Sequence, residues 1–360
     1  MQLDTAKRYL LSRPHGGFND TFVQLEKSAL YAEKFGRVLI LDMSRSGLGA
    51  QLDTLFDGSF DVGPELVVWD ADIAQACDRA ESVYPDFVKN RLSSYSVVVK
   101  FKPIRLVEKI SGETLNFDHS CDHDAQLLVY EQFGGGSASF RALKRLRLRA
   151  DVANAIVARL LPLGRGYDAV HIRHSDYKTQ FHRFLVRLRP LLHKRRVLIC
   201  SDSVAAKSAA QKILHRSTSV MSVADIPDIG KRALHHAKEL DAYDRNLDLL
   251  CDLFGMALSD QLFFTQVIAK ESGRRLYSGF SLLAELLRRN KDVVRQLLAN
   301  ADQEAVEALF APSPQVPGLY RRLQLWGQRQ ARRRMEKRTE KRFNRAERDQ
   351  PLAPESIGPR

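Results

Sequence analysis

Short runs of consecutive apolar residues alternate with longer amphipathic segments along most of this chain. Consecutive apolar residues suit strands buried on both faces, and amphipathic segments suit helices that cover a sheet. The pattern therefore predicts an α/β fold built on parallel sheets, with a first helix that ends at Gly36. The expected strands are residues 8–11, 38–41, 97–101, 127–130, 169–173, 197–200, 219–223 and 262–265.

The length of 360 residues fits two domains of common size better than one. A helix is predicted over residues 140–161, and a second α/β unit with a long helix at 232–258 follows it. We place the boundary near the start of the first of these helices. The predicted organisation is an N-terminal α/β domain at 1–145, a C-terminal α/β domain at 146–311, and a Pro-rich linker with a basic helical tail at 312–360.

The chain has 56 Lys and Arg against 43 Asp and Glu, a net charge of +13 that is concentrated near its C-terminus. Residues 319–349 hold twelve basic and four acidic side chains, a net of +8, which leaves +5 for the rest. A nucleic-acid arm needs aromatic residues interleaved with the basic ones for stacking, and only Trp326 and Phe343 are interleaved here. A solvated charged helix is a second interpretation. We favour a third, an amphipathic helix on an anionic membrane surface, and we expect no nucleic-acid partner.

Neither membrane spanning nor export is expected from the sequence. It has no run of about 18 apolar residues, and its N-terminus lacks the basic and apolar stretches of a signal peptide. The four cysteines are far apart and form no CxxC pattern. These features predict a cytoplasmic protein, at most peripheral to the inner face of the membrane.

The loop that follows the first expected strand contains Gly16 and Gly17 and leads into a helix. Ligands of open parallel sheets bind beyond the carboxyl ends of the strands. Two glycines there would let the backbone approach a ligand at a helix N-terminus. The alternative is a tight turn followed by a capping box, with Thr21 as the cap and Gln24 reaching back.

A second polar loop follows residues 169–170 and contains His171 and Arg173. Residues two apart in a strand share a face, so these two side chains should project together where an anion would lie. An arginine can hold phosphate oxygens with a fork of donors. The alternative is an arginine paired with Asp202 or Asp176. A metal site is disfavoured because the histidines here lack a usual ligand spacing.

Two further loops end apolar runs in the second half of the chain. Asp202 follows a strand and could accept hydrogen bonds from a nucleoside, unless it or Ser201 only caps the next helix. The segment 278–281 places small residues at a helix start, where backbone N–H groups can meet phosphate. Both loops therefore suit a nucleotide ligand.

In order and content these loops resemble those of the fucosyltransferase superfamily, which includes protein O-fucosyltransferases and the nodulation-type and core α-1,6-fucosyltransferases. The resemblance covers about residues 8–290 and rests on five ordered motifs. They are residues 15–20, residues 171–176 (H-x-R-x-x-D), Ser201-Asp202, Asp248-Leu249-Leu250 and Ser278-Gly279-Phe280-Ser281. His174 stands where many members have a second arginine, so the resemblance does not predict the linkage.

The resemblance implies a GT-B fold, with two Rossmann-like domains facing across a cleft and a GDP-fucose donor held mainly by the second. It implies that Arg173 contacts the donor pyrophosphate with His171 beside it, and that Asp202 lies near the nucleoside. The other implied donor-site residues are Gly16, Gly17, Asn19, Ser278, Gly279, Phe280 and Ser281. It also implies inversion at the anomeric centre without a metal or other cofactor.

An inverting transfer needs a group that receives the proton of the acceptor hydroxyl. Asp20, Glu131 and Asp176 are candidates for this base, and we place Asp20 with Arg173 and His171 as the catalytic residues. The function that we expect is transfer of fucose from GDP-fucose to a glycan hydroxyl in cell-surface polysaccharide or glycolipid synthesis. The alternatives are another nucleotide sugar, or a non-catalytic nucleic-acid-binding or scaffold protein.

Two other segments have competing interpretations. Residues 118–124 gather aspartates, histidines and a cysteine, but the spacing matches no usual zinc site, so a solvated acidic loop is favoured. Residues 133–137 contain three consecutive glycines and either border an acceptor groove or form a flexible turn. They lack the Lys-Ser or Lys-Thr of a P-loop.

Overall fold

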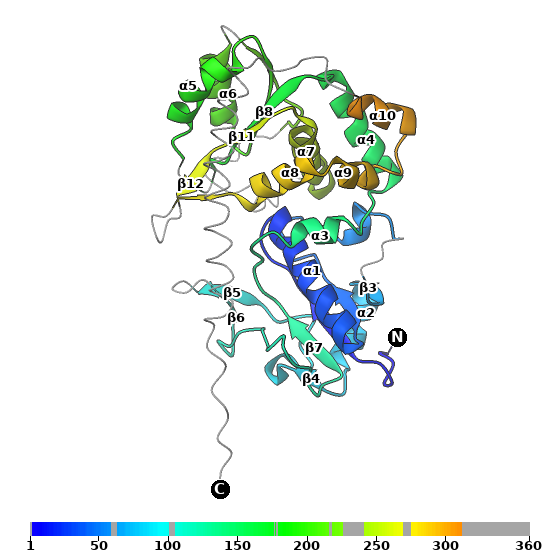
Figure 1. The fold of residues 1–360 in the computed structure, drawn as a ribbon. Coiled ribbons are helices and arrows are strands. Elements are labelled where there is room, and N and C mark those ends of the chain that lie inside the picture. The colour runs from blue at the N-terminus through cyan, green and yellow to red at the C-terminus, as the bar shows by residue number, and fades with distance from the viewer. Residues whose placement is uncertain are drawn as a thin grey trace. The chain divides into compact units, whose positions relative to one another are not determined.

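The computed structural model contains two parallel β-sheets, each flanked by α-helices (Figure 1). This confirms the predicted α/β class. No helix in the described part of the chain has the length and apolar character needed to cross a bilayer. The structure describes residues 2–58, 63–100, 105–175, 177, 179–215, 218–225, 241–268 and 275–311.

The first sheet has the strand order β3-β2-β1-β7-β4, and its strands pair in parallel. Both faces are covered, which explains why its strands read as unbroken apolar runs. Leu10 packs in one hydrophobic cluster with the first helix, while Leu11 packs in a second cluster with Ile73 and Cys77. The strands are β1 (Tyr9–Ser12), β2 (Val38–Leu41), β3 (Leu66–Val68), β4 (Val83–Tyr84) and β7 (Leu127–Tyr130).

The first helix ends where the sequence predicts. Gly36 has a φ of 62° and its N–H bonds to carbonyls of the last turn, a left-handed cap that glycine adopts without strain. The segment predicted as a strand at 97–101 pairs in a separate antiparallel hairpin, outside the main sheet. The elements are α1 (Phe18–Phe35), η1 (Leu52–Thr54), α2 (Ala71–Asp78), η2 (Asp86–Val88), β5 (Val97–Lys100) and β6 (Arg105–Glu108).

The second sheet has the order β10-β9-β8-β11 and is also parallel. Its strands lie at the four positions expected from the apolar runs. A short antiparallel hairpin of β12 (Gln266–Ile268) and β13 (Arg275–Tyr277) follows. The sheet strands are β8 (Tyr167–Ile172), β9 (Arg196–Ser201), β10 (Ser219–Met221) and β11 (Leu262–Phe264).

The helices of the second half pack around this sheet. The long helix expected at 232–258 is described from Ala242, where the side chain of Asp241 caps it by accepting from the N–H of Asp244. Its expected start lies outside the described residues. The helices are α5 (Phe181–Leu192), α6 (Val204–Leu214), α7 (Ala242–Leu258), α8 (Gly279–Arg289), α9 (Lys291–Leu297) and α10 (Gln303–Phe310).

The single helix predicted at 140–161 is wrong, because two helices and a 3-10 turn occupy this region. They are α3 (Ser139–Leu143), α4 (Ala150–Leu160) and η3 (Leu161–Leu163). Between the first two, arginines alternate with the buried Leu146 and Leu148, and the N–H of Leu148 bonds to the carbonyl of Leu297. This period of two belongs to extended chain and not to a helix.

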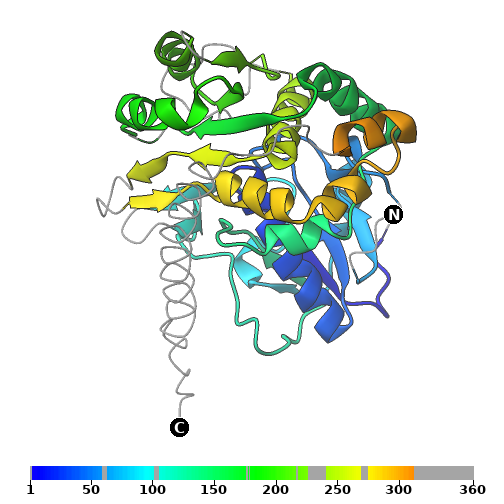
Figure 2. The same cartoon turned by 45° about the horizontal axis from the view of Figure 1, so that its top comes forward.

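Helices α1, α3 and α8 contact one another (Figures 1 and 2). One hydrophobic cluster runs through them and contains Leu10 and Phe22 from the first half with Leu250 and Leu283 from the second. The predicted boundary at 145/146 stays a prediction. By its contacts the chain divides into the units Met1–Ser313 and Pro314–Arg360, and the predicted tail at 312–360 lies outside the described residues.

Candidate active site

Arg173 follows the last residue of β8 and forms an ion pair with Asp202, which follows β9. Its Nη1 atom lies 2.9 Å from Oδ2 of Asp202, and its backbone N–H donates to Oγ1 of Thr265 at 3.3 Å. Asp202 is one of the two carboxylates, with Asp176, that the sequence offered as ion-pair partners of Arg173. The side chain is still 20% exposed, so the guanidinium is both fixed and accessible to an anion.

Asp202 also organises the loop that carries Arg173. It accepts from the backbone N–H groups of His174 and Ser175, at 2.9 and 3.2 Å, and from Oγ of Ser175 at 2.6 Å. Burial opposes ionisation of Asp202, but the charge of Arg173 and these donors outweigh it and lower its pKa. The capping interpretation was wrong, because Ser203 caps α6 by accepting from the N–H of Ala206.

His171 lies at the end of β8, two residues before Arg173, and is only 5% exposed. Its Nδ1 atom is 2.6 Å from Oγ of Ser281, and its ring centroid lies 5.6 Å from that of Phe280. Burial lowers the pKa of His171, and the charge of Arg173 acts in the same direction. His171 is therefore neutral near pH 7 and ties β8 to the first turn of α8.

The predicted segment 278–281 forms the start of α8. Ser278 is the N-cap residue and makes no side-chain capping bond, while its carbonyl accepts from the N–H of Leu282. Ser281 is 1% exposed and bonds to His171, so its hydroxyl lies inside the protein. A Cβ atom on Gly279 would lie 2.6 Å from Nδ2 of Asn19, so α8 is in close contact with the loop from the first sheet.

That loop places Asn19 and Asp20 in the first turn of α1. Gly16 has a φ of 93°, which requires glycine, and Gly17 is the N-cap residue. Asn19 is 6% exposed, accepts from Oγ of Ser139 at 2.7 Å, and donates to the carbonyl of Gly136 at 3.3 Å. Asn19 therefore joins three segments that are distant in the sequence.

Asp20 lies within electrostatic range of Arg173. Burial raises the pKa of Asp20, and a hydrogen bond from Asn19, the charge of Arg173 and a backbone bond from Gly17 oppose that rise. The predicted residues of the two sheets are thus brought together around Arg173. Asp176, the third residue considered as a base, lies outside the described residues.

The capping-box interpretation of this loop was wrong. Thr21 lies inside the first turn of α1 and donates to the carbonyl of Gly17, and Gln24 donates to the carbonyl of Phe133. The glycine run packs against the same turn, because a Cβ atom on Gly134 would lie 2.2 Å from the backbone oxygen of Asp20. The glycine run therefore packs directly against the turn that carries Asp20.

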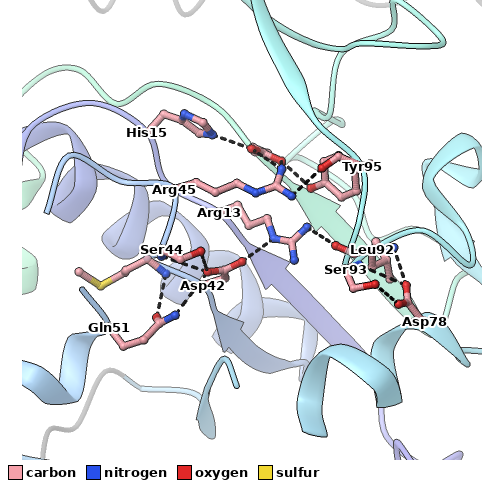
Figure 3. Close-up of polar contacts among 12 residues, drawn as sticks. Arg13, His15, Asp42, Ser44, Arg45, Gln51, Asp78, Leu92, Ser93 and Tyr95 are labelled. Carbon is pink, nitrogen blue, oxygen red and sulfur yellow. Dashed lines mark hydrogen bonds and ion pairs between the residues drawn. The ribbon is translucent and has the colours of Figure 1, made fainter. Parts of the chain in front are cut away.

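A buried polar cluster lies at the carboxyl edge of the first sheet (Figure 3), and the sequence predicted a role for its Glu131 but not for Arg13 or Asp42. Arg13 pairs with Asp42 at 2.8 Å, and both side chains are at most 2% exposed. The guanidinium of Arg13 also lies 4.4 Å from the ring centroid of Trp69. Charged residues directly after apolar runs were the signal that could have found this cluster.

Glu131 follows β7 and lies at the centre of a second set of contacts in this cluster. Its carboxylate is 2.6 Å from Nε2 of His15 and 3.1 Å from Nη1 of Arg45, and it accepts from the hydroxyl of Tyr95. Burial opposes ionisation of Glu131, but His15, Arg45 and Tyr95 outweigh it and lower its pKa. The side chain is 0% exposed, so it does not reach an acceptor directly.

Asp244, Asp248 and Asp252 lie one turn apart along α7. Asp248, from the Asp-Leu-Leu motif, pairs with Arg159 at 2.5 Å. Both line an open cavity of about 670 Å³, together with Pro162, Leu163, Met221, Ser222, Val223, Asp225 and Asp244. One turn further on, burial raises the pKa of Asp252 to about 7, and its Oδ1 makes no hydrogen bond with the described residues.

The segment 118–124 is held by ion pairs and aromatic packing. Asp122 pairs with Nε of Arg37 at 2.8 Å, and burial lowers the pKa of His119 to about 4 where it stacks on Phe117. Among the described residues no group of three His, Cys, Asp or Glu side chains could hold a metal ion. Asp118 accepts from Ser120 within the loop.

No protein-family model and no curated protein sequence matches this chain. Among solved structures it is similar to fucosyltransferase NodZ from Bradyrhizobium, with 18% identity, 78% of this chain and 93% of that chain covered, and a TM-score of 0.51. It is equally similar to NodZ α-1,6-fucosyltransferase soaked with GDP-fucose and to the enzyme co-crystallised with GDP, each with 18% identity, a TM-score of 0.51, and 78% of this chain and 92% of that chain covered. At this identity the likeness shows the fold alone, and the chain has the fold of these NodZ structures, the predicted GT-B fold.

Proposed function

We propose that this chain is an inverting glycosyltransferase that transfers fucose from GDP-fucose to a hydroxyl group of a glycan. The observation that carries the proposal is Arg173, held by Asp202 at the carboxyl end of β8 and approached by Asp20 from the other sheet. The fold of the NodZ structures, of which one was soaked with GDP-fucose and one co-crystallised with GDP, supports this donor.

The chemistry of the donor matches Arg173 and the start of α8. A nucleoside diphosphate carries negative charge, which a guanidinium fork and the N–H groups of a helix N-terminus both attract. As the bond between the anomeric carbon and the diphosphate oxygen breaks, further charge develops on the departing GDP. Arg173 stabilises this charge because Asp202 already holds it in place, so little reorganisation is needed.

The other residues predicted at the donor site are placed there by different contacts. His171 and Ser281 are buried and bonded to each other, which ties β8 to α8 beside Arg173 and suits a positioning role. Asn19 and Gly279 bring the first-sheet loop to the same place. The nucleoside contact of Asp202, the use of a glycan acceptor in cell-surface polysaccharide or glycolipid synthesis, and a cytoplasmic location stay part of the proposal.

The test combines nucleotide binding with turnover. The wild-type chain should be stabilised by GDP more than by UDP or CMP, by about 2.7 kcal/mol at 100 times Kd. It should also release GDP from GDP-fucose, and Arg173→Ala should lower that rate by about 10²–10³-fold. Arg187→Ala, an exposed arginine of α5, is the matched control and should keep both properties.

Each result separates the proposal from its alternatives. Stabilisation by UDP or CMP in place of GDP would indicate a different nucleotide sugar. Salt-dependent binding of generic DNA or RNA without stabilisation by any nucleotide would indicate a nucleic-acid-binding protein. An Arg173→Ala protein with full turnover would show that Arg173 does not act on the leaving group.

A further inference from the structure

The buried Glu131 holds the ring of His15 in one orientation. The carboxylate of Glu131 is 0% exposed and contacts His15. Nη1 of Arg45 lies 3.1 Å from each carboxylate oxygen, and the hydroxyl of Tyr95 donates to one of them. Arg45 is itself held over the Tyr95 ring, 4.4 Å from its centroid. These donors stabilise the ionised form of Glu131, so it is a fixed negative charge at neutral pH.

The ionised state of Glu131 determines which nitrogen of His15 carries the proton in the neutral ring. A carboxylate only accepts hydrogen bonds, so Nε2 of His15, 2.6 Å from Oε1, must be the donor. The lone pair is then on Nδ1, for which no hydrogen bond with the described residues is seen. The His15 side chain is 16% exposed, whereas Glu131 is enclosed, so of this pair only the imidazole can meet a substrate.

His15 lies in the loop that approaches the donor site. It directly precedes Gly16, at which a Cβ atom would lie 2.8 Å from Oδ2 of Asp20. Asp20 in turn lies within electrostatic range of Arg173. His15 therefore extends from the carboxyl edge of the first sheet, and Arg173 extends from the same edge of the second.

An inverting displacement needs a base and a leaving-group site on opposite sides of the anomeric carbon. Asp20 directly follows Asn19, which lies against Gly279 at the start of α8, so it shares the side that would receive the diphosphate. His15 pairs with Glu131 on the first sheet instead. We infer that His15 is the general base of the proposed transfer and that Glu131 is its positioning residue, an assignment that rests on the proposed function.

The acceptor O–H gives its proton to Nδ1 of His15 while its oxygen forms a bond to the anomeric carbon of fucose. The bond from that carbon to the diphosphate oxygen breaks, and its electron pair leaves with GDP. The imidazolium is stabilised by the Glu131 carboxylate and later loses its proton to water.

The experiment measures GDP release from GDP-fucose with water and with methyl glycosides of common hexoses as acceptors. His15→Gln should lower kcat by about 10²–10⁴-fold, the usual contribution of a general base, while KM for GDP-fucose and stabilisation by GDP stay unchanged. His15→Gly should regain part of its turnover when imidazole is added. His215→Gln, an exposed histidine at the end of α6, is the matched control.

Glu131→Gln tests the positioning role separately. It should lower kcat while KM for GDP-fucose stays unchanged, and imidazole should not rescue it, because His15 still occupies the space. If His15→Gln keeps kcat within twofold while Arg173→Ala loses turnover, the proposed function stands and the assignment of His15 is wrong. A wild-type chain that neither binds GDP nor turns over GDP-fucose overturns both.

Discussion

Replacing Gly134 by alanine should displace the first turn of α1. The added Cβ atom would lie 2.2 Å from the backbone oxygen of Asp20, 2.5 Å from its Cα and 2.6 Å from its carbonyl carbon. All three are backbone atoms, so no side-chain rotation relieves the clash. Ordinary contact begins at 3.4 Å, which requires the Asp20 Cα to move away by about 0.9 Å.

The expected cost follows from what this displacement breaks. Overpacking of this kind costs about 1–3 kcal/mol. The shift also strains two hydrogen bonds that join α1 to the glycine run, from Gln24 to Phe133 and from Asn19 to Gly136, each worth about 1 kcal/mol. We therefore expect a loss of about 2–4 kcal/mol, which lowers Tm by roughly 2 °C per kcal/mol in a protein of this size.

Turnover should fall as well, because a misplacement of about 1 Å can cost about 10²-fold in rate. The assay is thermal unfolding together with GDP release from GDP-fucose. Gly58→Ala is the matched control, since a Cβ atom there meets nothing within 4 Å. If Gly134→Ala melts within 1 °C of Gly58→Ala and turns over at the same rate, the loop does not depend on this contact.

Two further predictions concern charge. Burial raises the pKa of Asp252 from 3.8 to about 7, so the folded chain binds the extra proton in that window and stability falls as the pH rises through it. Asp252→Asn should therefore melt above the wild type at pH 8 and together with it near pH 4, and an equal difference at both pH values would contradict the burial argument. The full chain should sediment with anionic liposomes at low salt through residues 319–349, whereas a chain ending at Pro317 should not, and equal sedimentation of the two would exclude the membrane role.

The sequence was enough to predict most strands of the two sheets and the positions of the polar loops. Runs such as residues 38–41 and 127–130 predicted strands with the observed bounds, because short runs of consecutive apolar residues suit a sheet covered on both faces. Gly36 marked the end of the first helix for a local reason, its left-handed backbone. Arg173 was found because it directly follows such a run.

Some predictions from local sequence pattern were wrong, because tertiary packing outweighed the local preference. Thr21 and Gln24 have the spacing of a capping box, yet the Gln24 side chain bonds to Phe133, and Gly17 is the N-cap residue. Residues 145–149 alternate arginine with leucine inside the predicted helix, and the structure has a turn followed by extended chain there. The extended form holds because Leu146 and Leu148 are both buried.

Which polar residues contact one another follows from the packing of the whole fold and could not be predicted from the sequence alone. His15 and Glu131 are separated by 116 residues and come together because β1 pairs directly with β7. Arg173 meets Asp202 because β8 pairs with β9, and Asn19 meets Gly279 because α1 packs on α8. Strand order and helix packing arise because the apolar faces of all elements are buried together, so local periodicity does not predict them.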